Sequence, residues 1–153
     1  MKLELSRNEV PFIISGLSQL KGMKDWKKAI ALGDDLRKLR KIQKETEAAA
    51  KMCKPEKYDE LAIEFQERCK KKAAELGEQE GELLNDSEIG SHVMLIWKRS
   101  MEWTTNNRHY QEAINELSAE MIEIDLQTEK LSEEDFEKKA IDSSLGEVLS
   151  YFR

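Results

Sequence analysis

One long segment of this chain contains no proline, and a set of its residues recurs with the spacing of a heptad repeat, which would place them on one face of a helix. From Ala29 to Cys53 the positions on this face follow one another at alternating steps of three and four residues, and Pro55 ends the segment. This spacing predicts a helix with a coiled-coil-like seam. The seam consists of Ala29, Leu32, Leu36, Leu39, Gln43, Thr46, Ala50 and Cys53. Its second half is small or polar, so we expect that end to bury less surface.

The composition argues against an all-β fold. The chain has 153 residues but only 7 glycines and 2 prolines, whereas a sandwich or barrel needs frequent turns. Charged residues make up 37% of the chain and hydrophobic residues 39%, a balance that suits long helices. We therefore predict a mainly α fold, as a single elongated helical domain over residues 1–153.

Further helices are expected after the seam. Apolar residues recur every three or four positions between Pro55 and Gly77, so this segment is expected to pack on the first as an antiparallel helical hairpin. Another amphipathic pattern covers 89–101. The sequence "TTNN" at 104–107 is expected to interrupt or recap that helix before it resumes.

Both ends of the chain contain a short alternating pattern. "KLELS" at 2–6 and "MIEIDLQ" at 121–127 place apolar side chains on one face only, which is typical of a half-buried strand. Because one strand cannot stand alone, we predict that the two pair in a minimal two-stranded sheet. Ser6 and Glu9 have the spacing of a helix-capping box after the first strand, and Asn8 is a competing cap.

The last segment is predicted to be helical and to pack on the core. Ser132 is a suitable cap for it, and the helix is expected to be interrupted or re-initiated near "DSSLG" at 142–146. The expected contacts of this segment are Phe136, Leu145, Val148, Leu149 and Phe152.

No catalytic or metal-binding motif is present. The seven glycines are scattered, without a phosphate loop, dinucleotide fingerprint or nucleophile elbow. Cys53, Cys69, His92 and His109 are too widely spaced for a compact metal module. We expect free thiols, no metal, no cofactor and no enzymatic activity.

The chain is expected to be soluble and cytoplasmic. Its first ten residues alternate polar and apolar, unlike a signal peptide, and its longest apolar run is "VMLIW" at 93–97. This run is far shorter than the roughly 20 residues that cross a bilayer. We expect no membrane partner.

The stretch "GDDLRKLRKIQKE" at 33–45 is basic in a chain with a net charge of −6. At about 100° per residue, four of its cations form one stripe beside the seam. This basic stripe consists of Arg37, Arg40, Lys41 and Lys44. One interpretation is that it lies beside residues 112–137, which hold ten acidic residues and one lysine, a net charge of −9. The other is that it binds phosphates, and we favour the first.

The three tryptophans, Trp26, Trp97 and Trp103, are candidates for an exposed anchor that binds a partner. Trp97 shares a helical face with Val93 and Ile96, which favours core packing. Trp103 lies at the edge of "TTNN" and is the better candidate for an exposed partner-binding residue, since tryptophan is enriched at interfaces.

Several segments together resemble small bacteriophage-encoded helical proteins with coiled-coil-like character. These segments are "KLELSRNEV", "LSQLKGM", "LGDDLRKLRKIQKE" and "YQEAINELSAEMIEIDLQTEKLSEEDFE". The resemblance implies a phage or prophage product that acts in a bacterial cytoplasm or during particle assembly. It supplies no catalytic residue.

These observations favour a non-enzymatic protein–protein interaction module. We expect it to bind a host or virion protein through helix faces, and an inhibitor of a host or defence protein is one form of this hypothesis. One alternative is a structural or assembly protein that self-associates along the seam. The other is a nucleic-acid-binding accessory protein that uses the basic stripe at 37–44.

Overall fold

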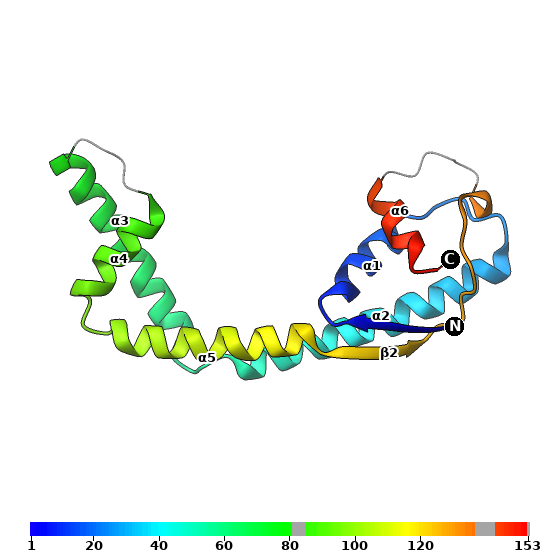
Figure 1. Ribbon diagram of the computed structural model, residues 1–153, viewed down its shortest axis with the longest axis horizontal. Coiled ribbons are helices and arrows are strands. Elements are labelled where there is room, and N and C mark those ends of the chain that lie inside the picture. Colours follow the sequence, from blue (N-terminus) through cyan, green and yellow to red (C-terminus); the bar gives the residue numbers. More distant parts are fainter. Residues whose placement is uncertain (81–84, 137–142, 153) are drawn as a thin grey trace. The chain divides into compact units, whose positions relative to one another are not determined.

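The structure is a computed structural model that describes residues 1–80, 85–136 and 143–152. Within these residues it is mainly helical and has one two-stranded sheet, which confirms the predicted fold class. In chain order (Figure 1) the elements are β1 (Lys2–Ser6), α1 (Glu9–Ser18), α2 (Trp26–Cys53), α3 (Tyr58–Glu80), α4 (Asp86–Ile96), α5 (Ser100–Ala119), β2 (Met121–Asp125), the 3-10 helix η1 (Glu133–Asp135) and α6 (Ser143–Ser150).

The sheet joins the two predicted strands. β1 pairs antiparallel with β2, so that Leu3 lies opposite Ile124 and Leu5 lies opposite Ile122. Leu5 and Ile124 are buried, whereas the charged residues that alternate with them are exposed. The alternating pattern therefore predicted both the strands and their buried face.

The second strand is shorter than predicted, because it ends at Asp125 rather than at 127. The backbone N–H groups of Gln127 and Thr128 donate to the carboxylate of Asp35 on α2, at 2.8 and 2.7 Å. A helix side chain therefore takes the hydrogen bonds that would continue the strand.

The chain divides into two compact units. Unit 1 consists of Met1–Met52 and Asn115–Arg153, and unit 2 consists of Cys53–Ile114. Each unit has its own hydrophobic cluster.

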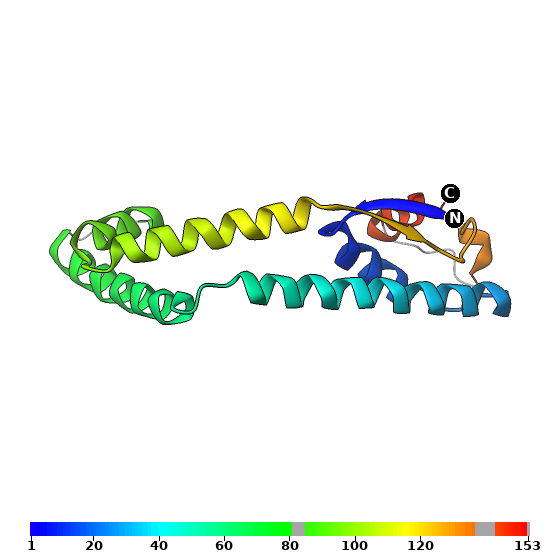
Figure 2. The same ribbon diagram turned by 90° about the horizontal axis from the view of Figure 1, so that it is seen from below.

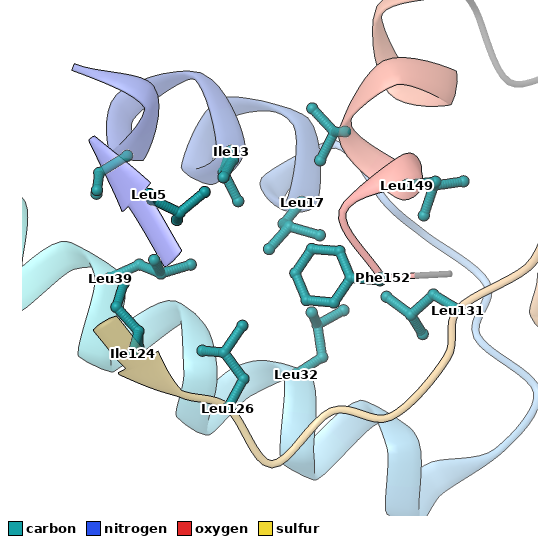
Figure 3. Close-up of a cluster of buried hydrophobic side chains, with 12 residues drawn as sticks. Leu5, Ile13, Leu17, Leu32, Leu39, Ile124, Leu126, Leu131, Leu149 and Phe152 are labelled. Carbon is teal, nitrogen blue, oxygen red and sulfur yellow. The ribbon is translucent and has the colours of Figure 1, made fainter. Parts of the chain in front are cut away.

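The core of unit 1 is mostly aliphatic and joins segments far apart in the sequence. Figure 3 shows Phe152, which is fully buried, among Leu17, Leu32 and Leu131. The buried residues of this cluster are Leu5, Val10, Ile13, Leu17, Leu32, Leu39, Ile124, Leu126, Leu131, Val148, Leu149 and Phe152.

The C-terminal segment packs on this core much as predicted. Phe136, Val148, Leu149 and Phe152 are all buried, while the side chain of Leu145 lies outside the described residues. Ser132 precedes the short helix η1, and its backbone N–H donates to Asp135 at 2.9 Å. A separate helix, α6, begins at Ser143, which confirms the predicted re-initiation near "DSSLG".

Helices α1 and α6 pack closely at one point in unit 1. A side-chain carbon added to Gly16 would clash with the side chain of Val148. Glu9 strengthens the same region, because it accepts hydrogen bonds from the Ser6 N–H at 2.8 Å and from the Tyr151 hydroxyl at 2.9 Å. The Ser6 hydroxyl also donates to Glu9 rather than capping the helix, so only the glutamate half of the predicted capping box forms.

The coiled-coil character and the hairpin of α2 with α3 are not confirmed. Leu32 and Leu39 of α2 belong to the core of unit 1, where α1, α6 and the strands surround them. Helix α3 packs on α4 within unit 2. Each helix therefore buries its apolar face within its own unit.

Unit 2 has a smaller core that contains aromatic rings. Leu61, Val93 and Trp97 are buried, which confirms the predicted core position of Trp97. The partly buried residues around them are Phe65, Cys69, Met94 and Trp103. Asn85 and Glu88 form a complete capping box at the start of α4.

The predicted helix break at 104–107 is wrong. Helix α4 ends at Ile96, and α5 then runs from Ser100 through "TTNN" without interruption. Trp97 has an extended backbone and is buried, while Asn107 accepts a hydrogen bond from the Tyr58 hydroxyl at 3.2 Å. Tertiary contacts therefore outweigh the weak helix propensity of threonine and asparagine.

Candidate functional site

The basic stripe lies on the outer side of α2. Arg37, Arg40, Lys41 and Lys44 are all exposed. Lys38 is separate from them and half-buried, and its ammonium group donates to the Asp125 carbonyl at 2.7 Å. The angular spacing therefore predicted correctly that Lys38 does not belong to the stripe.

The four cations of the stripe differ in their contacts. Arg37 forms an ion pair with Asp34 at 2.7 Å, and Arg40 donates to the Ser18 hydroxyl at 3.4 Å. Lys41 and Lys44 have neither an ion pair nor a side-chain hydrogen bond with any residue that the structure describes. These two lysines are therefore available to a negatively charged partner.

The interpretation that residues 112–137 neutralise the stripe is not confirmed. In the described part of the chain, no ion pair joins this acidic region to the stripe, and its carboxylates bind other cations. The side-chain ion pairs of this region are Arg7 with Glu120, Lys2 with Glu123 at 2.8 Å, and Lys28 with Asp135 at 2.6 Å.

Two exposed apolar residues extend the stripe toward the start of α2. Trp26 is 67% exposed and Ile30 is 56% exposed. At about 100° per residue, both lie on the same side of the helix as Arg37 and Lys44. The sequence indicated Trp26 as one of three tryptophans that could anchor a partner, and its exposure agrees with that, but its place on the stripe and the exposure of Ile30 were not predicted. Continuing the same angular calculation to Trp26 would have placed both on the stripe. We define the α2 outer face as Trp26, Ile30, Gly33, Arg37, Arg40, Lys41 and Lys44.

An open groove lies beside this face within unit 1. Its volume is about 310 Å³, near the lower end of the range of roughly 300–1,000 Å³ for ligand sites. Its walls are mostly apolar, with Lys21 and Arg40 as the charged residues. The groove is lined by Leu17, Ser18, Leu20, Lys21, Gly22, Met23, Ala29, Leu32, Gly33, Leu36, Arg40 and Phe136.

Gly33 has no packing role among the residues that the structure describes. It lies in the interior of α2, where glycine costs about 0.5–1 kcal/mol relative to alanine. A side-chain carbon added at Gly33 would meet nothing within 4 Å. The space above it, where the groove meets the α2 outer face, is therefore open to an approaching molecule.

The predicted seam changes character along α2. Leu32 and Leu39 are buried, and Leu36 is half-buried at the groove. At the other positions, Gln43, Thr46 and Ala50 are half-buried, whereas Ala29 and Cys53 are exposed. Thr46 accepts a hydrogen bond from Arg7 at 3.1 Å.

Asp35 fixes α2 to the segment after β2. Its carboxylate is fully buried and accepts three hydrogen bonds, from the backbone N–H groups of Gln127 and Thr128 and from the Thr128 hydroxyl. The Lys38 ammonium group lies 3.9 Å away. Because its acceptor oxygens are satisfied, Asp35 positions α2 and is not a candidate catalytic acid.

Trp103 belongs to unit 2, whereas the basic stripe belongs to unit 1, so the two do not form one site within a unit. It is half-buried, and its ring centroid lies 5.2 Å from that of Tyr58 and 5.8 Å from that of Phe65. Such distances are typical of stabilising aromatic pairs. The ring therefore contributes to the core of unit 2.

A polar network surrounds Trp97 in the same unit. The indole N–H donates to Glu64 at 2.9 Å, and Arg99 donates to Glu64 and Glu60 at 3.0 Å. The indole hydrogen bond, followed by the charges of Arg99 and Arg68, lowers the pKa of Glu64. Hydrogen bonding to Glu60 raises the pKa of Arg99. Glu64 and Arg99 therefore remain ionised near neutral pH, and the network acts as a structural contact.

The cysteines and acidic groups show no catalytic arrangement in the described residues. Cys53 and Cys69 are free thiols, and burial raises the pKa of Cys69, which makes its thiolate less accessible. In the part of the chain that the structure describes, no three His, Cys, Asp or Glu residues are placed to hold a metal ion. None of the described helices combines the length and apolarity that crossing a membrane requires.

In comparisons with known proteins, no family model, curated protein or solved structure matches this chain.

Proposed function

We propose that this protein is a non-enzymatic interaction module that binds another protein through the α2 outer face and the adjoining groove. The resemblance to phage-encoded proteins makes a host or virion protein the proposed partner. Covering a surface of that partner would block its other contacts, so inhibition is the proposed consequence.

The chemistry of the α2 outer face supports a protein partner. One end exposes Trp26 and Ile30, and exposed tryptophan is the residue type most enriched at binding hot spots. The other end carries Lys41 and Lys44, which would steer an acidic partner and set its orientation. An amphipathic segment with an apolar end and an acidic end would match both.

Gly33 is the single observation that carries the proposal. A glycine inside a long helix destabilises the free chain, and nothing within 4 Å of its added carbon explains its presence. A partner that packs against the helix backbone at the groove would explain it, because glycine allows the closest approach.

The exposure of Lys41 and Lys44 also favours a second candidate, a nucleic-acid-binding accessory protein. Phosphate binding gains strength from the number of cations that contact the backbone. Here Arg37 is already bound to Asp34, and the chain carries a net charge of −6. Two available lysines beside an apolar groove fit an acidic protein better than a phosphate backbone.

The test is a pull-down of the tagged full chain from nuclease-treated bacterial lysate, with mass spectrometry of what is retained. We expect one stoichiometric protein, and we expect Lys41→Glu/Lys44→Glu to lose it. The matched control is Lys70→Glu/Lys71→Glu, which makes the same charge change on exposed lysines of α3 and leaves retention unchanged.

A second pair of variants separates binding from folding. Gly33→Leu and Gly77→Leu each fill open space on a helix, so both should raise the free energy of unfolding by about 0.5–1 kcal/mol. Only Gly33→Leu should lose the partner. If the stabilised Gly33→Leu protein still retains the partner, the proposed surface is wrong. A parallel pull-down from lysate without nuclease tests the second candidate: if only nucleic acid is retained there, the second candidate replaces the first.

A further inference from the structure

We propose that two copies of this chain pair through the outer edge of β1, forming an antiparallel four-stranded sheet in the order β2-β1-β1-β2. This interface is separate from the α2 outer face, and it does not depend on the function proposed above. It is also different from self-association along the seam of α2.

The first step is that β1 has an edge without backbone partners. Met1 and Leu126 exchange both backbone hydrogen bonds at 2.7 Å, and the Arg7 N–H donates to the Glu120 carbonyl at 3.0 Å. In an antiparallel pair, hydrogen-bonded residues alternate along each strand. The odd-numbered residues of β1 therefore bond to β2, and the backbone groups of Lys2 and Glu4 point to the opposite edge.

The second step is that this edge remains open. Within the described residues, the backbone N–H and C=O groups of Lys2 and Glu4 form no hydrogen bond outside the sheet. The outer edge of β2 is different, because the Lys38 ammonium group covers its Asp125 carbonyl. In Figure 2, β1 (dark blue) has β2 on one side and no described strand on the other. An unpaired edge of this kind is a template for another strand.

The third step is the unbalanced charge of Glu4. It lies directly opposite Glu123 in the sheet, and like charges in that position are destabilising. The Lys2 ammonium group binds Glu123 at 2.8 Å, and no cation among the described residues forms an ion pair with Glu4. A cation supplied from outside the chain would balance this carboxylate.

A second copy supplies that cation in one register. If Leu3 lies opposite Leu3 of the second copy, Lys2 lies opposite the second copy's Glu4, and the same contact occurs twice about the two-fold axis. Both residues present their backbone groups to this edge, so the hydrogen-bonding pattern and the charges agree. The register that places Glu4 opposite Glu4 would repeat the like-charge contact and is disfavoured.

The test measures the dissociation constant of the dimer by analytical ultracentrifugation of the full chain over a range of concentrations. Lys2→Glu and Glu4→Lys should each raise this constant by on the order of tenfold or more, because each makes two like-charge contacts. Combining both changes in one chain should restore dimerisation, because the charges are then exchanged.

Glu123→Gln is the matched control. It removes the intrachain partner of Lys2 without changing the edge, so the dimer should persist. Circular dichroism of each variant verifies the fold, and recovery in the double variant shows that a single variant failed at the interface rather than in folding.

A cross-link tests the register independently. Leu3→Cys should form an intermolecular disulfide, because residues opposite each other without hydrogen bonds have Cα atoms about 4.5 Å apart. The background carries Cys53→Ser and Cys69→Ala. A chain that stays monomeric, a dimer that tolerates Lys2→Glu, or a double variant that stays monomeric would each overturn the proposal.

Discussion

The two units of this protein are stabilised in different ways. The core of unit 1 contains residues from both ends of the chain, such as Leu5 and Phe152. Unit 1 also buries a charged side chain, Asp35. Unit 2 uses only residues 53–114, and its few buried residues lie among stacked aromatic rings. Unit 1 therefore depends on contacts distant in sequence, whereas unit 2 depends on neighbouring helices.

This difference predicts different folding behaviour. Contacts between distant segments form slowly, because closing a long loop costs entropy before the contact stabilises it. The helices of unit 2 are adjacent along the chain and need no such closure. We expect the surface on α2 to form only when β2 and α6 have joined unit 1, since Asp35 and Leu39 hold this helix in place.

The largest expected effects come from one leucine in each core. Leu39→Ala in unit 1 and Leu61→Ala in unit 2 each remove a side chain with no exposed area, which costs about 2–5 kcal/mol of unfolding free energy. Amide hydrogen exchange should show that each change lowers protection mainly in its own unit. If either change lowered protection equally in both units, the two units would unfold together and the division into units would not apply to stability.

The next largest effect is expected at Asp35. Asp35→Asn keeps the shape of the side chain but replaces one acceptor oxygen with an amide that faces the donors of Thr128. A buried donor left without a partner costs about 1–3 kcal/mol, so the denaturation midpoint should fall. Glu64→Gln in unit 2 is the comparison, and its effect should be smaller because that carboxylate lies in a solvent-screened network. A larger loss from Glu64→Gln would reverse this ranking.

The sequence predicted the features that depend on local periodicity. The alternation in "KLELS" and "MIEID" identified both strands, and the spacing of 100° per residue separated Lys38 from the basic stripe. The groove could not be predicted in this way, because Phe136 meets α2 from a distant segment. Asp35 is similar, since one acidic residue in a charged run resembles its exposed neighbours until Thr128 is placed beside it.

The packing of α1 on α6 gives a further test of the long-range closure in unit 1. Gly16→Ala introduces a carbon that clashes with Val148, and overpacking of this kind costs about 1–3 kcal/mol. Gly146→Ala on α6 is the matched control, because an added carbon there meets nothing within 4 Å and should stabilise the helix by about 0.5–1 kcal/mol. Opposite shifts in thermal midpoint are the expected result, and a stabilising Gly16→Ala would show that α6 does not pack against α1.

The smallest expected effect is the pH dependence of each unit. Hydrogen bonds from Ser6 and Tyr151 lower the pKa of Glu9 in unit 1, as the Trp97 indole lowers that of Glu64 in unit 2. A carboxyl group whose pKa is lowered by folding stabilises the protein above its unfolded pKa, near 4.5, and loses that contribution as pH falls through the folded value. Acid should therefore weaken both units.

Alkaline pH should distinguish the two units. The hydrogen bond to Glu9 raises the pKa of Tyr151, so the neutral phenol stabilises unit 1 below pH 10, and this contribution is lost as pH rises through the folded value. Tyr151→Phe should reduce both the acid and the alkaline dependence of unit 1, whereas Glu64→Gln should change only the acid dependence of unit 2. Hydrogen exchange of each unit from pH 3 to about pH 11 measures this, after correction for the intrinsic exchange rate. If Tyr151→Phe left the loss of protection of unit 1 at alkaline pH unchanged, the hydrogen bond between Glu9 and Tyr151 would not contribute to the packing of α6 on α1.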